Sequence, residues 1–148
     1  MKTVVRFLCL TALMAAFLCG CSVNREIPRG YTDKEEYIHD IWQDGTAYCK
    51  YYYPDDNVPV IHSYFREVTE EDIAGIRGYF ADFAGWMEVE NEDGYDFDPA
   101  CVTPGDYVRI RADEFGSPGD LIYDKYFGYT VWFFDTESCI LYYIEVNL

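Results

Sequence analysis

The segment Tyr126–Asn147, YFGYTVWFFDTESCILYYIEVN, decides the fold of this chain. Aromatic and β-branched residues, which favour strands, fill both of its halves. Between the halves lies the polar run Asp135-Thr136-Glu137-Ser138, whose composition is typical of a turn. The segment therefore predicts an antiparallel hairpin in which Phe134 and Cys139, the residues on either side of this run, pair with each other.

Both faces of this hairpin are apolar. Because alternate residues of a strand point to opposite faces, one face carries Tyr129, Val131, Phe133, Ile140, Tyr142, Ile144 and Val146, and the other carries Thr130, Trp132, Phe134, Leu141 and Tyr143. A sheet with one face in water does not need two apolar faces. We therefore expect either protein layers on both faces or an aromatic face that binds a ligand.

A strand upstream carries the only basic pair in the C-terminal half of the chain. Residues 107–112 follow the turn sequence Pro104-Gly105-Asp106 and alternate, with apolar residues on one face and Arg109 and Arg111 on the other. The two guanidinium groups could bind a carboxylate or a phosphate in a bidentate manner. Alternatively, they neutralise nearby acids on the sheet.

The best-defined helix signal begins at Thr69, because Thr69 and Asp72 have the spacing of a capping box. One apolar stripe at helical spacing is formed by Ile73, Ile76, Phe80, Phe83 and Met87. Gly75, Gly78 and Gly85 interrupt this helix, and each lowers helix stability by about 1 kcal/mol relative to Ala. We expect these small residues to let the helix lie close to a sheet.

The N-terminal part of the domain predicts a further helix and two strands. Thr32 and Glu35 form a second capping box, and apolar residues at helical spacing follow them, so we expect a helix over 33–44. Two segments, Thr46–Tyr53 and a second one from Val58 or Val60 to about Val68, contain β-favouring residues and flank a Pro-Asp-Asp-Asn turn sequence. These two segments predict a second antiparallel hairpin.

The order of the elements contains no alternating strand–helix–strand units, which argues against a parallel sheet. We predict an α+β fold: a single small domain over residues 31–148, with an antiparallel sheet of about five to six strands and two helices packed on it. Residues 21–30 contain Pro28 and Gly30 and have no hydrophobic periodicity, so we interpret them as a flexible tether.

The first 20 residues have the composition of an export signal. Lys2 and Arg6 are followed by an apolar run of twelve residues, Phe7–Leu18, which is too short to span a bilayer as a helix. The run ends in Leu18-Cys19-Gly20-Cys21, which resembles the lipobox of bacterial lipoproteins. Members of that family usually carry Ala or Ser at the position of Cys19. A secretory signal with an ordinary cleavage site is the alternative.

The lipobox resemblance implies that a signal peptide, residues 1–20, is removed and that Cys21 receives diacylglycerol and a fatty acid such as palmitate. It also implies an extracytoplasmic location, with the lipid holding the protein to a membrane of the bacterial cell envelope. The rest of the chain resembles small bacterial lipoproteins that end in a Tyr-rich hairpin, and this similarity implies no particular activity.

The mature chain is strongly acidic. Without residues 1–20 it has 128 residues, with nine Lys and Arg against 27 Asp and Glu, which gives a formal charge of −18. This charge argues against a nucleic-acid partner, because the phosphates of a nucleic acid require a basic surface. We expect no direct adsorption to anionic lipid either, so that attachment to the membrane depends on the lipid at Cys21.

Cysteine and histidine offer few routes to catalysis. Besides Cys21, the mature chain contains Cys49, Cys101 and Cys139, which either form one disulfide with one thiol left over or remain buried as free thiols. A Cys49–His62 pair across the second hairpin is one candidate for nucleophilic catalysis, and paired carboxylates are another. The common serine-hydrolase and zinc-protease motifs do not occur in the chain.

An acidic loop offers ligands for a cation. Asp93, Asp96 and Asp98 lie close together in the sequence around Gly94, but the spacing does not match the calcium loop of an EF-hand. We expect a solvated loop and no cofactor, with a calcium site as the alternative.

The aromatic residues suggest a binding role. Trp132 and Tyr143, with Tyr142 and the run Tyr51-Tyr52-Tyr53, could form a stacking surface for a sugar or a peptide. We therefore expect a membrane-anchored, non-enzymatic binding module whose ligand is a protein, a peptide or a glycan. A small envelope hydrolase is the alternative.

Overall fold

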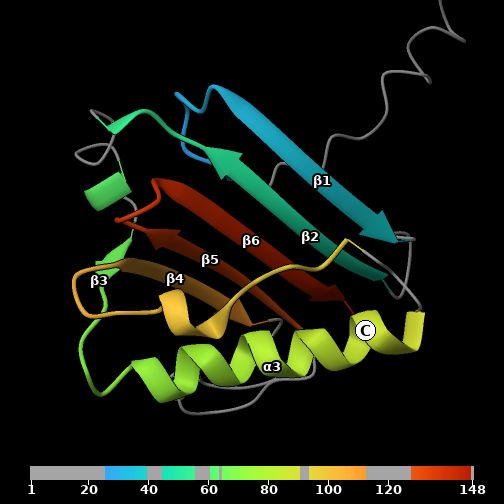
Figure 1. Cartoon of the computed structure of the whole chain (residues 1–148). Coiled ribbons are helices and arrows are strands. Elements are labelled where there is room, and N and C mark those ends of the chain that lie inside the picture. Colours follow the sequence, from blue (N-terminus) through green and yellow to red (C-terminus); the bar gives the residue numbers. More distant parts are fainter. Residues whose placement is uncertain are drawn as a thin grey trace, which may run out of the picture.

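Six antiparallel strands form one open sheet, and a long helix lies across one of its faces (Figure 1). The order of the strands is β1-β2-β6-β5-β4-β3. This computed structural model describes residues 26–39, 45–55, 61–63, 65–90, 94–112 and 128–147. The elements are β1 (Asp33–His39), β2 (Gly45–Tyr52), β3 (Arg66–Glu67), α3 (Ile73–Glu90), the 3-10 helix η2 (Pro99–Cys101), β4 (Tyr107–Ala112), β5 (Tyr129–Asp135) and β6 (Ile140–Asn147).

The predicted α+β domain with an antiparallel sheet is confirmed, and the sheet has six strands. The prediction of two packed helices is wrong, because α3 is the one α-helix longer than a single turn among the described residues. No helix in the described part of the chain is long and apolar enough to cross a membrane.

The hairpin of β5 and β6 forms the centre of the sheet, as predicted, but its register differs by two residues. Phe134 pairs with Leu141, and Asp135 pairs with Ile140. The Asp135 carboxylate accepts hydrogen bonds from the backbone N–H groups of Glu137 and Ser138 and from the Ser138 hydroxyl. This side chain closes a turn of the same length, one residue later than predicted. Because the shift is even, the two predicted faces are unchanged.

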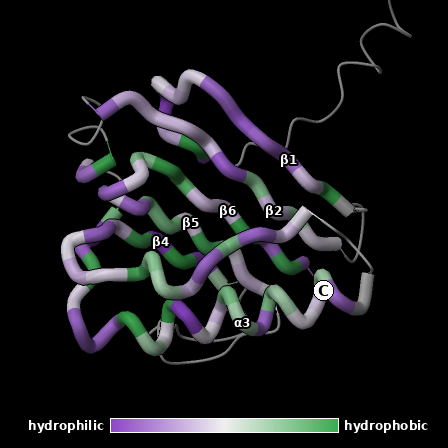
Figure 2. The backbone as a smooth tube through the Cα atoms, viewed as in Figure 1, coloured by the Kyte–Doolittle hydropathy of each residue, from purple (hydrophilic) through white to green (hydrophobic). Residues whose placement is uncertain are grey.

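The helix α3 packs on the face of the sheet that carries Val131, Phe133 and Ile144. Its predicted stripe supplies the other side of this core, since Ile76, Phe80, Phe83 and Met87 are buried. The remaining members of the cluster are Tyr48, Val68, Tyr79, Phe97, Val102, Val108, Tyr129 and Val146. Figure 2 shows that apolar residues are concentrated in β5 and β6, whereas much of β1 is hydrophilic.

Half of the predicted capping box precedes α3: Asp72 bonds back to the N–H of Thr69, but the N–H of Asp72 donates to the Thr69 carbonyl and not to its hydroxyl. The Asp72 carboxylate accepts hydrogen bonds from the backbone N–H and the hydroxyl of Thr69, and it pairs with both terminal nitrogens of Arg66. The expected role of the helix glycines is wrong at Gly78 and Gly85. A methyl group added at either position would meet nothing within 4 Å, so neither glycine is required for a close approach to the sheet.

The predicted first helix is wrong. Residues 33–39 form β1, which pairs with β2, and residues 40–44 lie outside the described part of the chain. Glu35 does not cap a helix: its carboxylate accepts a hydrogen bond from the Tyr52 hydroxyl at 2.7 Å and pairs with Lys50 at 2.7 Å. These contacts across the sheet replace the local interactions of the capping box, which alone cannot decide between a strand and a helix.

The second predicted hairpin is also wrong. Its first strand exists as β2, but β2 pairs with β1 and β6. Among the described residues of the second strand, only Arg66–Glu67 is extended, and it pairs with β4. Ile61 begins a helical turn, and Phe65, four residues later, is also buried on the sheet. The Phe65 backbone N–H donates to the Ile61 carbonyl at 3.3 Å, which is the hydrogen bond of a helical turn. Residues 56–60 and 64 lie outside the described residues.

An apolar cluster covers the second face of the sheet as well. Its members are Ala47, Cys49, Tyr51, Tyr53, Ile61, Phe65, Tyr107, Trp132, Phe134, Cys139, Leu141 and Tyr143, with Ile27 packed against them. The expectation that protein layers cover both faces is therefore met at these positions.

Candidate functional site

The four residues predicted to bind a ligand lie together on the sheet face opposite α3. The register places Arg109 beside Trp132 and Trp132 beside Tyr143, so that the three residues form a row across β4, β5 and β6. Arg111 lies two residues further along β4, where it pairs with Thr130. The sequence indicated each face separately, and the strand order brings the residues together.

Both guanidinium groups lie on one indole ring. The Arg109 and Arg111 guanidinium carbons are 5.0 Å and 5.7 Å from the centroid of Trp132. The Tyr143 ring meets the same indole edge-on, with the centroids 5.5 Å apart. Such cation–π contacts hold a guanidinium in place. Trp132 and Tyr143 are each only 1% exposed, so these rings position the two arginines and leave no open aromatic surface for stacking.

The two arginines differ in their partners. Arg109 pairs with the carboxylate of Glu26 at 2.5 Å. Arg111 is exposed, and its hydrogen bond is to the Thr130 hydroxyl at 3.5 Å. Among the described residues, no carboxylate pairs with Arg111. Its guanidinium is therefore the group on this face best able to donate hydrogen bonds to an anionic ligand.

Residues 26–28, within the segment expected to be a tether, contact the same face of the sheet. Besides the Glu26–Arg109 ion pair, the Tyr53 hydroxyl donates a hydrogen bond to the carbonyl of Pro28 at 2.6 Å, and Ile27 packs against the apolar cluster. The start of the described chain is thus fixed beside the arginine pair.

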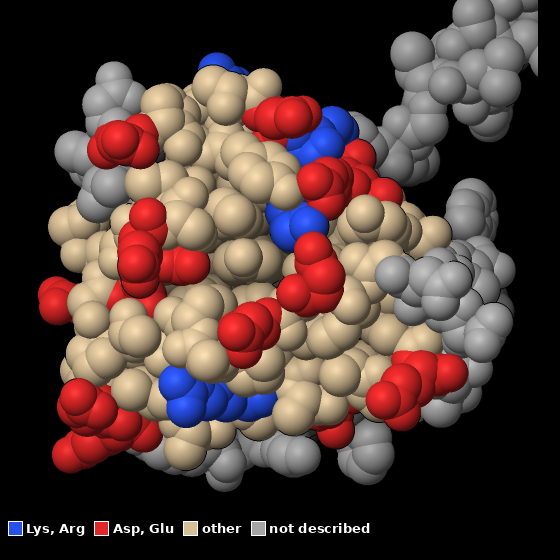
Figure 3. All heavy atoms as spheres, in the orientation of Figure 1, with Lys and Arg blue, Asp and Glu red and all other residues tan. Residues whose placement is uncertain are grey.

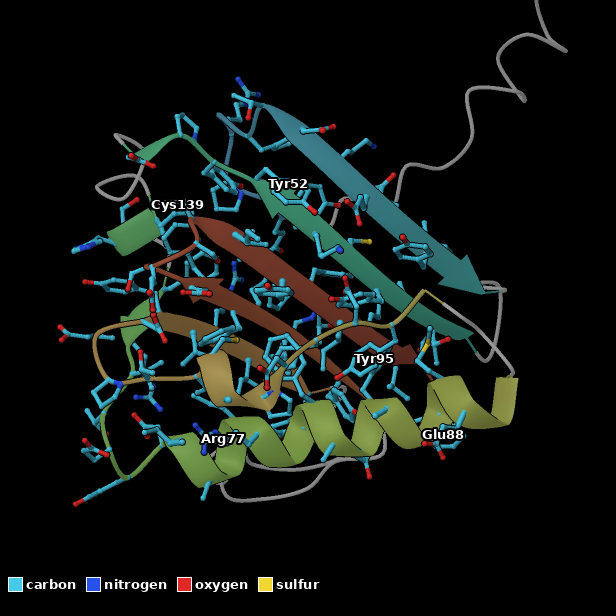
Figure 4. All side chains as sticks on the ribbon, in the orientation of Figure 1. Tyr52, Arg77, Glu88, Tyr95 and Cys139 are labelled. Atoms are coloured by element: carbon cyan, nitrogen blue, oxygen red, sulfur yellow. The ribbon has the colours of Figure 1, made fainter. Side chains whose placement is uncertain are left out.

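A charged network that the sequence did not indicate lies on the other face, at β2. The Lys50 ammonium contacts Asp96 at 2.8 Å and Glu35 at 2.7 Å. Two tyrosines donate to the same carboxylates, Tyr48 to Asp96 and Tyr52 to Glu35. Figure 4 shows Tyr52 on β2 and Tyr95 on the segment that follows α3 and carries Asp96. A lysine between tyrosines on alternate positions of β2 was the one signal for this network in the sequence.

The network explains the ionisation of its members. Burial lowers the pKa of Lys50, but its contacts with Asp96 and Glu35 outweigh burial and hold this pKa above the usual value. Burial likewise raises the pKa of Asp96, but hydrogen bonds from Lys50 and Tyr48 hold it below the usual range. Hydrogen bonds from Lys50 and Tyr52 lower the pKa of Glu35. All three groups remain charged near neutral pH, as a structural ion cluster requires.

The residues considered for calcium have separate roles. Asp96 belongs to the Lys50 network, and Asp98 accepts a hydrogen bond from the backbone of Ala100 at the start of η2. Asp93 lies outside the described residues. Within the part of the chain that the structure describes, no three acidic, histidine or cysteine side chains are placed to hold a metal ion.

The structure separates Cys49 from His62. His62 packs on Tyr107 of β4, with the ring centroids 4.1 Å apart and the Tyr107 hydroxyl 3.3 Å from Nδ1. Cys49 lies on β2, three strands away, or about 14 Å at the usual strand spacing of about 4.8 Å. The two residues therefore do not form a nucleophile and base. The side chain of His39 lies outside the described part of the structure.

The surroundings of the cysteines on the folded domain do not favour a reactive thiolate. No disulfide joins any two of Cys49, Cys101 and Cys139, so the alternative of one disulfide is not realised. Burial, with the nearby charge of Asp135, raises the pKa of Cys101 to about 12. Burial also raises the pKa of Cys139, whose thiol donates to Asp55. A nucleophilic cysteine requires the opposite shift.

On the face of the molecule drawn in Figure 3, acidic side chains are spread over the surface and basic side chains occupy only a few positions. No family model, no curated protein and no solved structure matches the chain.

Proposed function

We propose that this protein is a bacterial lipoprotein, held outside the cytoplasm by lipid on Cys21, whose folded domain is a non-enzymatic interaction module. Its ligand is a protein, a peptide or a glycan that presents an anionic group to Arg111 and Arg109. The lipobox resemblance of Leu18-Cys19-Gly20-Cys21 supports the membrane attachment. The arginine pair on Trp132 supports the binding role.

The single observation that carries the binding role is that two cations share one buried indole. Like charges on neighbouring positions of one strand face repel each other, so a sheet does not gain stability by placing them together. Glu26 compensates only Arg109. A ligand carboxylate or phosphate would compensate the second charge and accept the paired N–H groups of the guanidinium.

The contacts of the arginines also favour binding in energetic terms. Trp132 is fixed between Arg109 on β4 and Tyr143 on β6 by the register of the sheet. Side chains that are already ordered lose less conformational entropy when a ligand binds, which increases affinity. The acidity of the rest of the domain would direct an anionic ligand to this pair and away from other surfaces.

The test is a quantitative cross-linking pull-down of the full lipidated protein from its native envelope, with three variants. Arg111→Ala removes the guanidinium that no carboxylate of the described residues compensates, Arg111→Lys keeps the charge but not the paired donors, and Arg29→Ala removes an exposed arginine outside the pair. We expect the captured ligand to fall about tenfold with Arg111→Ala, to fall less with Arg111→Lys, and to be unchanged with Arg29→Ala. Equal recovery by wild type and Arg111→Ala would contradict the proposal.

A further inference from the structure

The strand β1 forms one edge of the described sheet (Figure 1). It has seven residues and pairs with β2 along its whole length. A strand at an edge has main-chain N–H and C=O groups on its outer side that can pair with a further strand. The opposite edge, β3, has only two residues, so β1 offers the longer template.

The exposed apolar side chains of the domain are concentrated at this edge. Within the described residues, the exposed large hydrophobic side chains are Tyr31 at 40%, Tyr37 at 36% and Ile38 at 45%. Tyr37 and Ile38 belong to β1, and Tyr31 lies just before it. Because apolar side chains of this size are usually buried, their grouping on one edge indicates a contact surface.

The exposed tyrosines are held in position by their neighbours. The Tyr37 ring stacks on Tyr48 with 6.1 Å between centroids, and Tyr31 meets Tyr51 edge-on at 5.1 Å. Gly94 lies directly against the Tyr37 ring, where any β-carbon would overlap it. These rings therefore present a fixed surface, which favours binding because little side-chain freedom is lost.

The edge also has a net negative charge. Asp33, Glu35 and Glu36 of β1 and the neighbouring Asp96 carry four negative charges, against two positive charges on Lys34 and Lys50. Glu35 and Asp96 remain 42% and 60% exposed in spite of their contacts with Lys50. A strand with basic side chains would neutralise the remaining negative charge of this cluster.

We propose that β1 binds an extended segment of a partner protein by antiparallel strand addition. Adjacent residues of β1 lie on opposite faces of the sheet, so each partner residue is matched to one neighbour. The partner places apolar residues beside Ile38 and Tyr37 and basic residues beside Glu36 and Glu35. Read from its N-terminus, the bound segment has the pattern apolar, apolar, basic, basic.

A second copy of this chain fits the edge less well than a basic segment does. Antiparallel pairing of two β1 strands centred on Glu36 would place the two Glu36 carboxylates beside each other, and like charges in that position are destabilising. The formal charge of the whole chain, −16, adds to this repulsion. The negative charge of this edge thus disfavours pairing with β1 of a second copy and favours pairing with a basic strand.

This edge is distinct from the arginine pair of the proposed function. Arg109 and Arg111 lie on β4, four strands from β1, or about 19 Å at the usual strand spacing. A failure to bind an anionic ligand at the arginine pair would therefore leave the strand-addition proposal unaffected, and a failure of strand addition would leave the arginine pair unaffected.

Fluorescence anisotropy with the full chain in detergent tests the proposal. The probe is a labelled peptide with the core Val-Ile-Lys-Arg between Thr and Gly residues. Two matched peptides carry Val-Ile-Glu-Glu, or Val-Ile-Lys-Arg with methylated backbone nitrogens that cannot donate hydrogen bonds. We expect the first peptide to bind at least about tenfold more tightly than either control, because strand addition needs both the charges and the main-chain donors.

Protein variants locate the site. Glu36→Lys and Ile38→Lys should each weaken binding of the basic peptide about tenfold, whereas Glu70→Lys, an exposed acid near the β3 edge, should leave it unchanged. Thermal melting confirms that each variant is folded. The proposal is overturned if the basic peptide does not bind at about 1 mM, if backbone methylation has no effect, or if Glu36→Lys binds normally. It is also overturned if sedimentation shows a dimer that Ile38→Lys dissociates.

Discussion

Asp106 shows how one residue connects distant parts of this chain. It is 1% exposed, and its carboxylate accepts hydrogen bonds from the backbone N–H and the hydroxyl of both Thr103 and Thr136. Thr103 belongs to the turn before β4, and Thr136 belongs to the turn between β5 and β6. The carboxylate therefore joins the two turns, and its four bonds offset the cost of burying a charge.

Replacing Asp106 with Ala should destabilise the domain by about 3 kcal/mol, because buried N–H groups lose a charged acceptor. Asp98→Ala is the matched control: Asp98 is exposed and accepts one hydrogen bond, from Ala100 at the start of η2. The control should cost about 0.5 to 1 kcal/mol, as other capping residues do. Urea denaturation measures both free energies of unfolding. Equal losses in the two variants would show that Asp106 does not connect the turns.

For single residues, the sequence predicted those features that depend only on neighbouring positions in the chain. The alternation in 107–112 places Arg109 and Arg111 on one face, and the structure agrees. It could not predict that both arginines lie on Trp132, because this depends on the register between β4 and β5. Lys50 and Asp96 are 46 positions apart, and no local pattern relates them.

Among the elements, the contact between Gly94 and Tyr37 gives the sharpest prediction. A β-carbon at Gly94 would overlap the Tyr37 ring, which stacks on Tyr48, so Gly94→Ala should destabilise the domain by about 1 to 3 kcal/mol. Gly78→Ala in α3 is the matched control, since a methyl group there meets nothing within 4 Å. The control should stabilise the domain by about 0.5 to 1 kcal/mol.

Thermal or urea unfolding of the two glycine variants checks this prediction. The variants make the same chemical change, so any difference in the free energy of unfolding reports the surroundings of the two glycines. If Gly94→Ala is as stable as wild type, the segment after α3 does not pack on β1 as described.

The elements also show why the helix was predicted and β1 was not. The apolar stripe of α3 runs from Ile73 to Met87, about four turns of a helix, so its pattern repeats several times. The segment that forms β1 has only seven residues, and its capping residues suit a helix equally well. Its strand state is decided by Tyr52 and Lys50, which bind Glu35 from β2. Such contacts join residues on different strands, so the pattern within one segment cannot predict them.

For the whole molecule, the buried tyrosines predict a loss of stability at high pH. Burial raises the pKa of Tyr142 to about 12 and raises those of Tyr48, Tyr53, Tyr95 and Tyr129 further. In the unfolded chain these groups ionise near pH 10. Above that pH the unfolded state releases protons that the folded state retains, so the free energy of unfolding decreases as pH rises.

Urea denaturation between about pH 8 and about pH 11 measures this effect, at about 1.4 kcal/mol per pH unit for each tyrosine that ionises only on unfolding. The absorbance of tyrosinate should increase together with unfolding rather than before it. A free energy of unfolding that is constant across this range would contradict the burial of these hydroxyl groups.

The general architecture followed from the sequence because it depends on composition and order. Two apolar faces on the C-terminal hairpin predicted either layers on both sides of a sheet or an aromatic face that binds a ligand, and the structure has an apolar cluster on each face. The layer on the second face includes Ile27, Ile61 and Phe65, which lie in segments expected to be a tether and a strand. Their positions depend on packing over the sheet, which no periodicity in those segments expresses.

We propose that lipid on Cys21 holds this interaction module at a membrane, and metabolic labelling with an alkyne fatty acid tests this proposal most directly. Wild-type protein and Cys19→Ala, which alters the neighbouring cysteine, should both incorporate the label and appear in the membrane fraction. Cys21→Ala should incorporate none and accumulate as an uncleaved precursor. Labelling that persists in Cys21→Ala, or that is absent from wild type, would contradict lipid attachment at Cys21.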